Sequence, residues 1–276
     1  MKQIILIFML FVSVLIPMTT MSASKPVKKY KAKELTLTNV PFIHAGAGEH
    51  YPAMGYDEDG WSCRGYMSSS EMRGEHLPKG DMIALQRLEQ RKAKVRKDFV
   101  DSMSKKAVRI CRHYDIPPSI LVAQAILESN YGTSRLSNTA NNLFGHMSGS
   151  TTPQKGIEGR MKAFDKNVAG KTKSYHFRMY ETIWWSMHYH LKLIEGKYAY
   201  RLIKADSKRE SYMAALCGCK DKRMLASDAM WQANNKGFLY AGACAWTAKD
   251  GVTSRYIAEL RFIIQKHNLD KLDGKT

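Results

Sequence analysis

The chain has 276 residues and 44% of them are hydrophobic, which is enough to bury a core and excludes a globally disordered protein. Lys and Arg number 43 against 25 Asp and Glu, a formal net charge of +18. A charge this positive predicts an anionic partner surface. The sequence contains no helix-turn-helix, zinc-finger or RNA-binding signature, so we do not expect that partner to be nucleic acid.

The first 23 residues have the layout of a secretory signal peptide. One Lys precedes an apolar run from Ile4 to Pro17, and small polar residues follow. The run is shorter than the roughly 20 residues of a membrane-spanning helix, and an uncleaved N-terminal anchor is the alternative interpretation. The sequence therefore predicts a secreted or periplasmic protein, whose positive charge would meet an anionic envelope surface.

Residues 24–80 form the next segment, a basic tail followed by an irregular stretch rich in Gly and aromatic residues. The stretch has no helical or strand period, so we expect loops that pack on the main domain. The sequence "DEDG" at 57–60 lacks the central Gly and the distal Glu of a calcium loop. We interpret it as a turn and expect no metal there.

From residue 81 the pattern becomes helical, and we assign residues 81–272 to one domain. Apolar residues recur at spacings of three and four through 81–113, which predicts one long helix or two. Pro117 and Pro118 then open a helix over 118–130 that is expected to stop at Gly132. Further helices are predicted at 181–195, 207–217, 223–234 and 253–267, with two short strands at 160–164 and 174–180.

Glu128 follows an apolar run, "AQAIL", near the end of the 118–130 helix. It shares a helix face with Leu121 and Gln124, so its carboxyl should lose hydration and its pKa should rise. The negative end of the helix dipole acts in the same direction. A raised pKa suits a general acid near neutral pH. The alternative is an ion pair with Arg112 or Arg135 at the edge of a core.

The five cysteines are Cys63, Cys111, Cys217, Cys219 and Cys244. An odd number leaves at least one unpaired within the chain. Cys244 could pair with Cys217 or with Cys219, and Cys63 could pair with Cys111. Zinc is the alternative for the Cys217-x-Cys219 pair, but the usual ligand spacing of two to four residues is absent. We therefore expect no metal site.

Two motifs carry a resemblance to a known family. The stretch "AQAILESNYGTS" at 123–134 and "NNLFG" at 141–145 resemble the signature of bacterial peptidoglycan glucosaminidases, the mannosyl-glycoprotein endo-β-N-acetylglucosaminidase-like family. Similarity continues through "FRMYETIWWS" at 177–186 and a closing helix at 254–269. Lysozyme-like transglycosylases usually carry Gly-Leu-Met-Gln where Asn-Leu-Phe-Gly stands here.

The resemblance implies a mainly α, lysozyme-like α+β domain with a small β-hairpin lobe flanking the substrate cleft. It implies an exported hydrolase of peptidoglycan glycan strands that cleaves the β-1,4 bond on the reducing side of N-acetylglucosamine. Glu128 would be the general acid, with no cofactor. An N-acetylmuramidase, a lytic transglycosylase and a catalytically silent glycan-binding or scaffold module are the alternatives, and the oligomeric state is left open.

Glycosidases usually use two carboxylates, and the resemblance implies that the second lies in the hairpin lobe. Glu158 matches best, Asp165 is the second choice and Glu181 the third. A separation of about 6.5–9.5 Å from Glu128 would leave room for a water and predict inversion. Assistance by the 2-acetamido group of the substrate is the alternative.

The resemblance also implies residues that bind the sugar. Trp184 and Trp185 could stack on sugars, although core packing is the simpler interpretation. Asn141 and Asn142 could bind N-acetyl groups or form an ordinary turn. The expected substrate-binding residues are Gln124, Ser129, Tyr131, Asn142, Phe144, Gly145 and Tyr180, with Tyr240 or Trp246 in place of a family tyrosine before the last helix.

Overall fold

The structure is a computed structural model that describes residues 67, 69–74, 80–148, 155–166, 172–220, 223–235 and 239–275. The predicted signal peptide, the "DEDG" turn and Cys63 lie outside these residues. Helices dominate, and the strands form one two-stranded sheet. The prediction of a mainly α fold with a small β-hairpin is confirmed.

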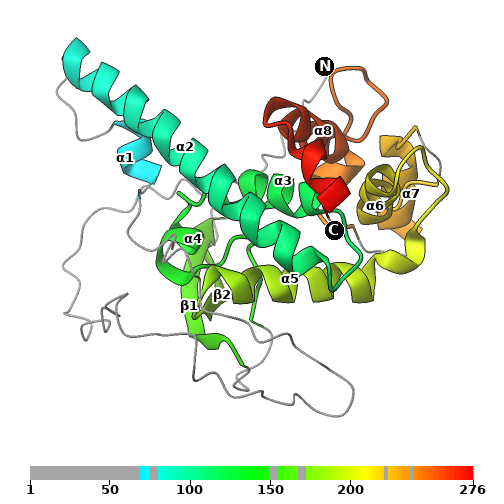
Figure 1. The fold of residues 1–276 in the computed structure, drawn as a ribbon. Helices are drawn as coiled ribbons and strands as arrows, with labels where there is room; N and C mark the ends of the chain where they lie inside the picture. The colour runs from blue at the N-terminus through cyan, green and yellow to red at the C-terminus, as the bar shows by residue number, and fades with distance from the viewer. Residues whose placement is uncertain are drawn as a thin grey trace, which may run out of the picture. The chain divides into compact units, whose positions relative to one another are not determined.

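The elements follow one another in nearly the order that the sequence predicts (Figure 1). The short α1 lies in the segment predicted to be irregular, and α4 was not predicted. The helices are α1 (Ser69–Arg73), α2 (Met82–Cys111), α3 (Pro118–Ser129), α4 (Arg135–Ala140), α5 (Ile183–Lys197), α6 (Lys208–Cys217), α7 (Ala226–Asn235) and α8 (Arg255–Lys266), with 3-10 helices η2 (Ala199–Arg201), η3 (Gly242–Ala245) and η4 (Leu269–Lys275), and the strands are β1 (Ile157–Lys166) and β2 (Thr172–Tyr180).

Helix α2 is a single helix of 30 residues, so the first of the two predicted alternatives is confirmed. It starts where the Asp81 carboxylate accepts a hydrogen bond from the Ala84 backbone N–H at 2.8 Å, a standard N-cap. At its N-terminal half, Leu88 and Val95 form a buried cluster with residues near α1. The described part of the 24–80 segment therefore packs on the main domain, as expected.

Helix α3 is the central element of the domain. It contacts α2, α8 and η4, and Figure 1 shows it behind α2. Ten of its twelve residues are buried, because the sequence is apolar on almost every side and such a helix is stable only inside a core. The helix thus fixes the position of its last residues relative to the elements that surround it.

The end of α3 differs from the prediction. The helix ends at Ser129, and three consecutive residues, Asn130, Tyr131 and Gly132, have left-handed φ angles of 48°, 57° and 73°. Asn130 takes the left-handed capping position that the sequence assigned to Gly132, since Asn also tolerates this conformation. Glu128 therefore lies one residue before the end of the helix.

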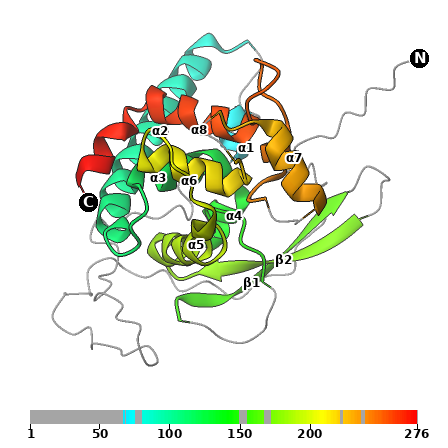
Figure 2. The ribbon, with the colours of Figure 1, turned by 90° about the vertical axis from the view of Figure 1, so that its right-hand side faces the viewer.

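The hairpin is attached to the helical domain at its base. Met147 forms an antiparallel bridge with Phe177, and the Tyr189 hydroxyl of α5 donates a hydrogen bond to the Lys155 carbonyl at 2.9 Å. Figure 2 shows the two strands side by side. The outer parts of the strands, 164–166 and 172–174, belong to a different compact unit from the helices.

Trp184 and Trp185 are core residues, each with 8% exposure, so the core-packing interpretation is confirmed. The Trp185 ring packs directly against Gly156. Its φ is +75°, and a Cβ at this position would lie 2.0 Å from a Trp185 ring atom. Only glycine lets the start of β1 approach the indole this closely.

One disulfide, Cys217–Cys244, joins the end of α6 to η3, so the first of the two pairings left open for Cys244 is the one formed. The Cys63–Cys111 pair, given as a possibility, is not formed. Cys111 is a free thiol, fully buried at the end of α2. Cys219 is also a free, buried thiol. In the part of the chain that the structure describes, no helix is long and apolar enough to cross a membrane.

Candidate active site

Among the residues that the structure describes, the Glu128 carboxyl accepts one hydrogen bond, from the Tyr256 hydroxyl to Oε1 at 3.0 Å. Tyr256 lies in the first turn of α8, so the contact joins the two helices that pack against one another in the core. Among the described residues Glu128 forms no ion pair, and the alternative of a salt bridge with Arg112 or Arg135 is excluded.

The environment of Glu128 combines two properties that rarely coincide. Its side chain is exposed to solvent, yet the pKa of its carboxyl is raised to about 7. Loss of hydration is the main cause of the rise. The hydrogen bond from Tyr256 opposes the rise, and the charge of Glu259 adds to it. Accessible surface measures whether water can touch the residue, whereas desolvation reflects how much protein surrounds it. The carboxyl therefore occupies a partly enclosed position that remains open to solvent.

Gln124 and Tyr240 complete the immediate surroundings. Gln124, one turn before Glu128, donates from Nε2 to the Tyr256 hydroxyl at 3.2 Å. The Tyr240 ring packs with its centroid 5.4 Å from that of Tyr256. Burial raises the pKa of both tyrosines well above the usual value, and the Glu128 charge raises it further. Both hydroxyls thus keep their protons, and the Tyr256 hydroxyl donates to the carboxylate.

Two histidines lie behind Gln124. His190 of α5 is fully buried, stacks on Phe144 with centroids 3.7 Å apart, and its Nε2 lies 3.1 Å from Gln124 Oε1. Its Nδ1 lies 3.2 Å from Nε2 of His146, whose own Nδ1 lies 2.7 Å from the Tyr180 hydroxyl. Burial lowers the pKa of His146 to about 3 and that of His190 well below the usual value, so both rings are neutral.

Five of the expected site residues are brought together in this way: Glu128, Gln124, Phe144, Tyr180 and Tyr240. The other four are linked to Glu128 only through Tyr256, His190 or His146, which were not among the predicted site residues. Tyr256 lies in the closing helix of the resemblance, at 254–269, but was not predicted as a site residue, and the two histidines were missed. A signal for His190 exists, because it occupies the apolar face of α5 with Met187 and Ile194, where a histidine must find hydrogen-bond partners.

Ser129 and Tyr131 have other uses. The Ser129 hydroxyl donates to the Ala125 carbonyl at 2.5 Å and accepts from the Gly132 N–H at 2.8 Å, so it stabilises the left-handed end of α3. The Tyr131 hydroxyl lies 2.9 Å from His267 Nε2. Neither side chain belongs to the network around Glu128.

The adjacent asparagines fasten the loop before the hairpin. Asn142 is buried, donates from Nδ2 to the carbonyls of His146 and Arg178 at 2.9 Å each, and accepts from the His146 N–H at 2.9 Å. Asn141 donates to the carbonyls of Tyr180 and its neighbour at 3.2 Å. These amides hold the loop against β2 and place the His146 ring. Gly145 in the same loop is exposed with a φ of +67°.

The remaining expected residues lie on other elements. Glu158 is exposed on β1, and Asp165 belongs to the outer part of that strand, where its side chain lies outside the described atoms. Glu181 is exposed directly after β2. Trp246 is half-buried after η3, where its carbonyl accepts a hydrogen bond from the Arg255 N–H at 2.7 Å.

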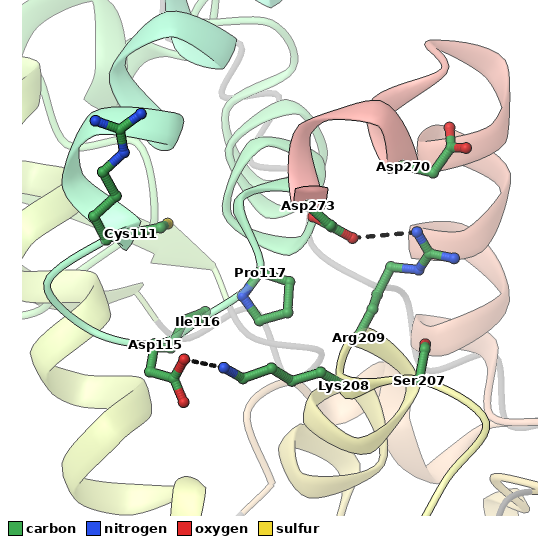
Figure 3. Close-up of a pocket in the computed structure, with 10 residues that line it drawn as sticks. Cys111, Asp115, Ile116, Pro117, Ser207, Lys208, Arg209, Asp270 and Asp273 are labelled. Carbon is green, nitrogen blue, oxygen red and sulfur yellow. Dashed lines mark hydrogen bonds and ion pairs between the residues drawn. The ribbon is translucent and has the colours of Figure 1, made fainter. Parts of the chain in front are cut away.

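A cavity of about 380 Å³ lies elsewhere, where the end of α2, the start of α6 and η4 meet (Figure 3). Its wall contains the ion pairs Asp115–Lys208 and Arg209–Asp273. Asp273 also accepts hydrogen bonds from the Ser119 N–H at 2.9 Å and the Ser119 hydroxyl at 2.8 Å. Pro117, the N-cap residue of α3, makes no side-chain capping hydrogen bond. The bonds from Ser119 to Asp273 therefore cap the start of α3, and this part of the cavity wall has a structural role.

A desolvated carboxyl at the end of a buried helix, accessible to solvent and in contact with one tyrosine hydroxyl, is the arrangement expected of a glycoside hydrolase acid. Residues 104–269 match the model of the family described as mannosyl-glycoprotein endo-beta-N-acetylglucosaminidase. The matched region is more than half of the 276 residues, and the chain belongs to this family. The resemblance stated from the motifs is confirmed.

Several individual proteins are similar to this chain. The exo-glucosaminidase LytG of Bacillus subtilis is 42% identical over 97 residues, which cover 34% of this chain and 33% of that protein. A probable N-acetylmuramidase of Lactococcus lactis is 29% identical over 183 residues, 64% of this chain and 35% of that protein. The chain thus spans about a third of the length of these curated relatives. The catalytic domain of the autolysin Auto from Listeria monocytogenes aligns with a TM-score of 0.43 and 21% identity, over 75% of this chain and 98% of that one.

Proposed function

We propose that this protein hydrolyses the glycan strands of peptidoglycan at the β-1,4 bond on the reducing side of N-acetylglucosamine. The observation that carries the proposal is the Glu128 carboxyl, which is exposed to solvent while its pKa is raised to about 7 by loss of hydration. About half of such carboxyls are protonated at neutral pH, so the group can donate a proton to a bound substrate.

The hydrogen bond from Tyr256 assigns the two carboxyl oxygens different roles. Tyr256 occupies Oε1, so the acidic proton resides on Oε2. As the bond between the anomeric carbon and the glycosidic oxygen breaks, Oε2 gives its proton to that oxygen and the negative charge that develops on Glu128 is stabilised by the Tyr256 hydroxyl. Water attacks the anomeric carbon, and its proton passes to a second group.

For the second carboxylate we propose Glu158, with Asp165 and Glu181 as the next choices. Glu158 is exposed on β1, and the base of the hairpin is joined to the site through Tyr180. We expect Glu158→Gln to lower hydrolysis about 10²–10⁴-fold, as for loss of a general base. The variants Asp165→Asn and Glu181→Gln are measured beside it. A large loss in either of these, with Glu158→Gln unaffected, would move the role to that residue.

The bond that is cut is tested through the reducing ends of the products. Purified sacculi are digested, the fragments are reduced, and mass spectrometry identifies the reduced sugar. We expect N-acetylglucosamine. N-acetylmuramic acid would indicate a muramidase, the activity named for the Lactococcus relative, and a 1,6-anhydro sugar would indicate a lytic transglycosylase.

The role of Glu128 is tested with Glu128→Gln on the same sacculi. Glutamine preserves the size of the side chain and an acceptor for Tyr256 but has no proton to give, so the rate should fall about 10²–10⁴-fold. Glu89→Gln, an exposed change on α2, is the matched control and should keep the wild-type rate. Wild-type activity in Glu128→Gln would refute the assignment, and sacculus binding without hydrolysis in the unaltered protein would indicate a silent module.

We also propose that the protein acts outside the cytoplasm after removal of residues 1–23. The apolar run in the leader and the Cys217–Cys244 disulfide both support this location, because disulfides persist in oxidising compartments. N-terminal sequencing of protein recovered from the cell envelope should begin after residue 22, 23 or 24. A chain that begins at Met1 would identify an uncleaved anchor.

A further inference from the structure

A continuous line of hydrogen bonds extends from Glu128 into the core. Tyr256, Gln124 and His190 follow one another at 3.0, 3.2 and 3.1 Å. His146 then continues the line from His190 at 3.2 Å. These residues come from α3, α8, α5 and the loop before the hairpin, so each bond joins groups that are distant in the sequence.

The line ends at Tyr180, whose hydroxyl lies 2.7 Å from His146 Nδ1. Arg178 acts on the same hydroxyl through its charge and its hydrogen-bonding groups. A guanidinium can only donate, so it cannot take the Tyr180 proton, which is left for His146. This end of the line therefore faces Arg178, a group that cannot accept a hydrogen bond. The Gln124 amide, with Nε2 on Tyr256 and Oε1 on His190, has the same direction.

The chemistry of each member then fixes the direction of every bond. A neutral histidine has one N–H and one acceptor nitrogen. His146 accepts at Nδ1 and must donate from Nε2. His190 accepts that bond at Nδ1 and donates from Nε2 to Gln124 Oε1, which leaves the Gln124 amide to donate to Tyr256. The Tyr256 proton is then free for Glu128. Donors and acceptors match at every step.

We infer that His190 and His146 are positioning residues, which set the direction of this hydrogen-bond line so that Tyr256 donates to Glu128. The inference rests on the proposed function of Glu128 as an acid. If the line were reversed, Gln124 would present its oxygen to Tyr256, and Tyr256 would donate to Gln124 instead of to the carboxylate. Glu128 would then keep its proton more tightly and lose its fixed orientation.

Other groups near Glu128 also affect the pKa of its carboxyl. Glu259 on α8 raises the pKa of Glu128 by its charge. Tyr240 and Tyr256 face it as neutral hydroxyls. At the far end of the line, the positive charge of Arg178 adds to burial in lowering the pKa of His146 and also acts on Tyr180. A change in the line and a change in Glu259 should therefore move the pKa of Glu128 in opposite directions.

The first test removes the distant end of the line. Tyr180→Phe keeps the buried ring but lets His146 adopt either tautomer, so the direction is no longer enforced. We expect the pKa of the Glu128 carboxyl, followed by the ¹³C signal of its side chain, to rise by about one pH unit, which corresponds to partial loss of a hydrogen bond to a charged group. If turnover is measurable, the alkaline limb of kcat should move upward by the same amount. His190→Phe is the second variant, with the same expectation.

Two controls separate this effect from a general disturbance. Tyr114→Phe removes a different tyrosine–histidine hydrogen bond, the one to His188 Nδ1, and should leave the Glu128 pKa unchanged. Glu259→Gln should lower it. An equal rise in Tyr114→Phe, or no rise in Tyr180→Phe and in His190→Phe when both fold, would overturn the inference.

A measurement on the unaltered protein avoids any folding defect of the variants. The ¹⁵N signals of His146 and His190 should show neutral rings protonated at Nε2 throughout pH 5–8. Protonation at Nδ1, or a charged ring at pH 7, would overturn the inference. These signals do not depend on turnover, so an inactive protein with the expected tautomers would count against the proposed function and leave the hydrogen-bond line in place.

Discussion

The role proposed for Glu128 places two opposing requirements on its carboxyl. Catalysis by proton donation requires a carboxyl that is neutral near pH 7, and stability favours a carboxylate that is hydrated or paired with a cation. The structure gives it a tyrosine hydroxyl in place of a cation. One neutral donor moderates the rise in pKa without forcing ionisation, as a salt bridge would. The choice of Tyr256 as partner is therefore as important as the apolar surroundings.

Tyr256→Phe should show this moderating role. Loss of the hydroxyl removes the one interaction that lowers the pKa of Glu128, so the alkaline limb of the kcat profile should move to higher pH. The maximum rate should fall about 10-fold or more, because the developing charge on Glu128 loses its donor. A pH profile on sacculi measures both. An unchanged limb would mean that the hydroxyl does not act on Glu128 in solution.

Glu128→Gln should change the stability of the protein in a pH-dependent way. The folded pKa is about 7 against an ordinary value of 4.5. Between these pH values the folded state binds more protons than the unfolded state, so this group destabilises the wild type as pH rises from 4.5 to 7. The variant lacks this loss. Its melting temperature should exceed that of the wild type at pH 8 and approach it at pH 4, and an equal difference at both pH values would contradict the assignment.

At the scale of elements, α3 determines the position of Glu128. It is buried along almost its whole length, and hydrogen bonds hold it at both ends. Asp273 from η4 caps the start, and Ser129 with three left-handed residues fixes the end. Two residues on its last two turns, Gln124 and Glu128, both contact Tyr256. Their shared face was correctly predicted from the i, i+4 spacing.

The cap of α3 gives a stability prediction. Asp273→Ala removes the acceptor for the Ser119 N–H and for Arg209 (Figure 3). The free energy of unfolding should fall by about 1–2 kcal/mol, the usual value for a lost N-cap. Denaturant unfolding measures it. Asp270→Ala, an exposed aspartate in the same 3-10 helix, should change it by less than about 0.5 kcal/mol, and equal effects of the two changes would refute the cap.

The sequence predicted the long elements well because apolar periodicity is a local signal. Helices α2, α3, α5, α6, α7 and α8 and both strands have close counterparts in the predicted ranges. The short α4 has six residues and little apolar pattern, so it was missed. The use of Asn142 and Ser129 for backbone hydrogen bonds was also unpredictable, because a motif shows which residue is present and not which way its side chain points.

At the scale of the whole molecule, the site is assembled from segments that span more than a hundred residues. Glu128 and Tyr256 are 128 positions apart, and His190 lies between them in the sequence. Spacing along the chain cannot reveal such contacts, and for this reason the histidines escaped prediction. The family motif located Glu128, and only the packing of α3, α5 and α8 shows what surrounds it.

The disulfide stabilises one part of this assembly. Cys217 and Cys244 are 27 positions apart and enclose the segment that carries Tyr240. Replacing both cysteines with serine should lower the free energy of unfolding by about 2–4 kcal/mol. A reductant should destabilise the wild type by a similar amount and leave the double variant unaffected. If reductant has no effect on the wild type, the bond does not stabilise the folded protein.

The most direct test of the central claim is the pKa of Glu128 itself. The carboxyl carbon of a protein labelled with ¹³C at glutamate is followed by NMR from pH 3 to 9, and the signal is assigned by its absence from Glu128→Gln. We expect a midpoint near 7, with exposed glutamates such as Glu89 serving as internal references. A midpoint near 4.5 for Glu128 would mean that the carboxyl is ionised at neutral pH, and it would contradict the role of this residue as the acid.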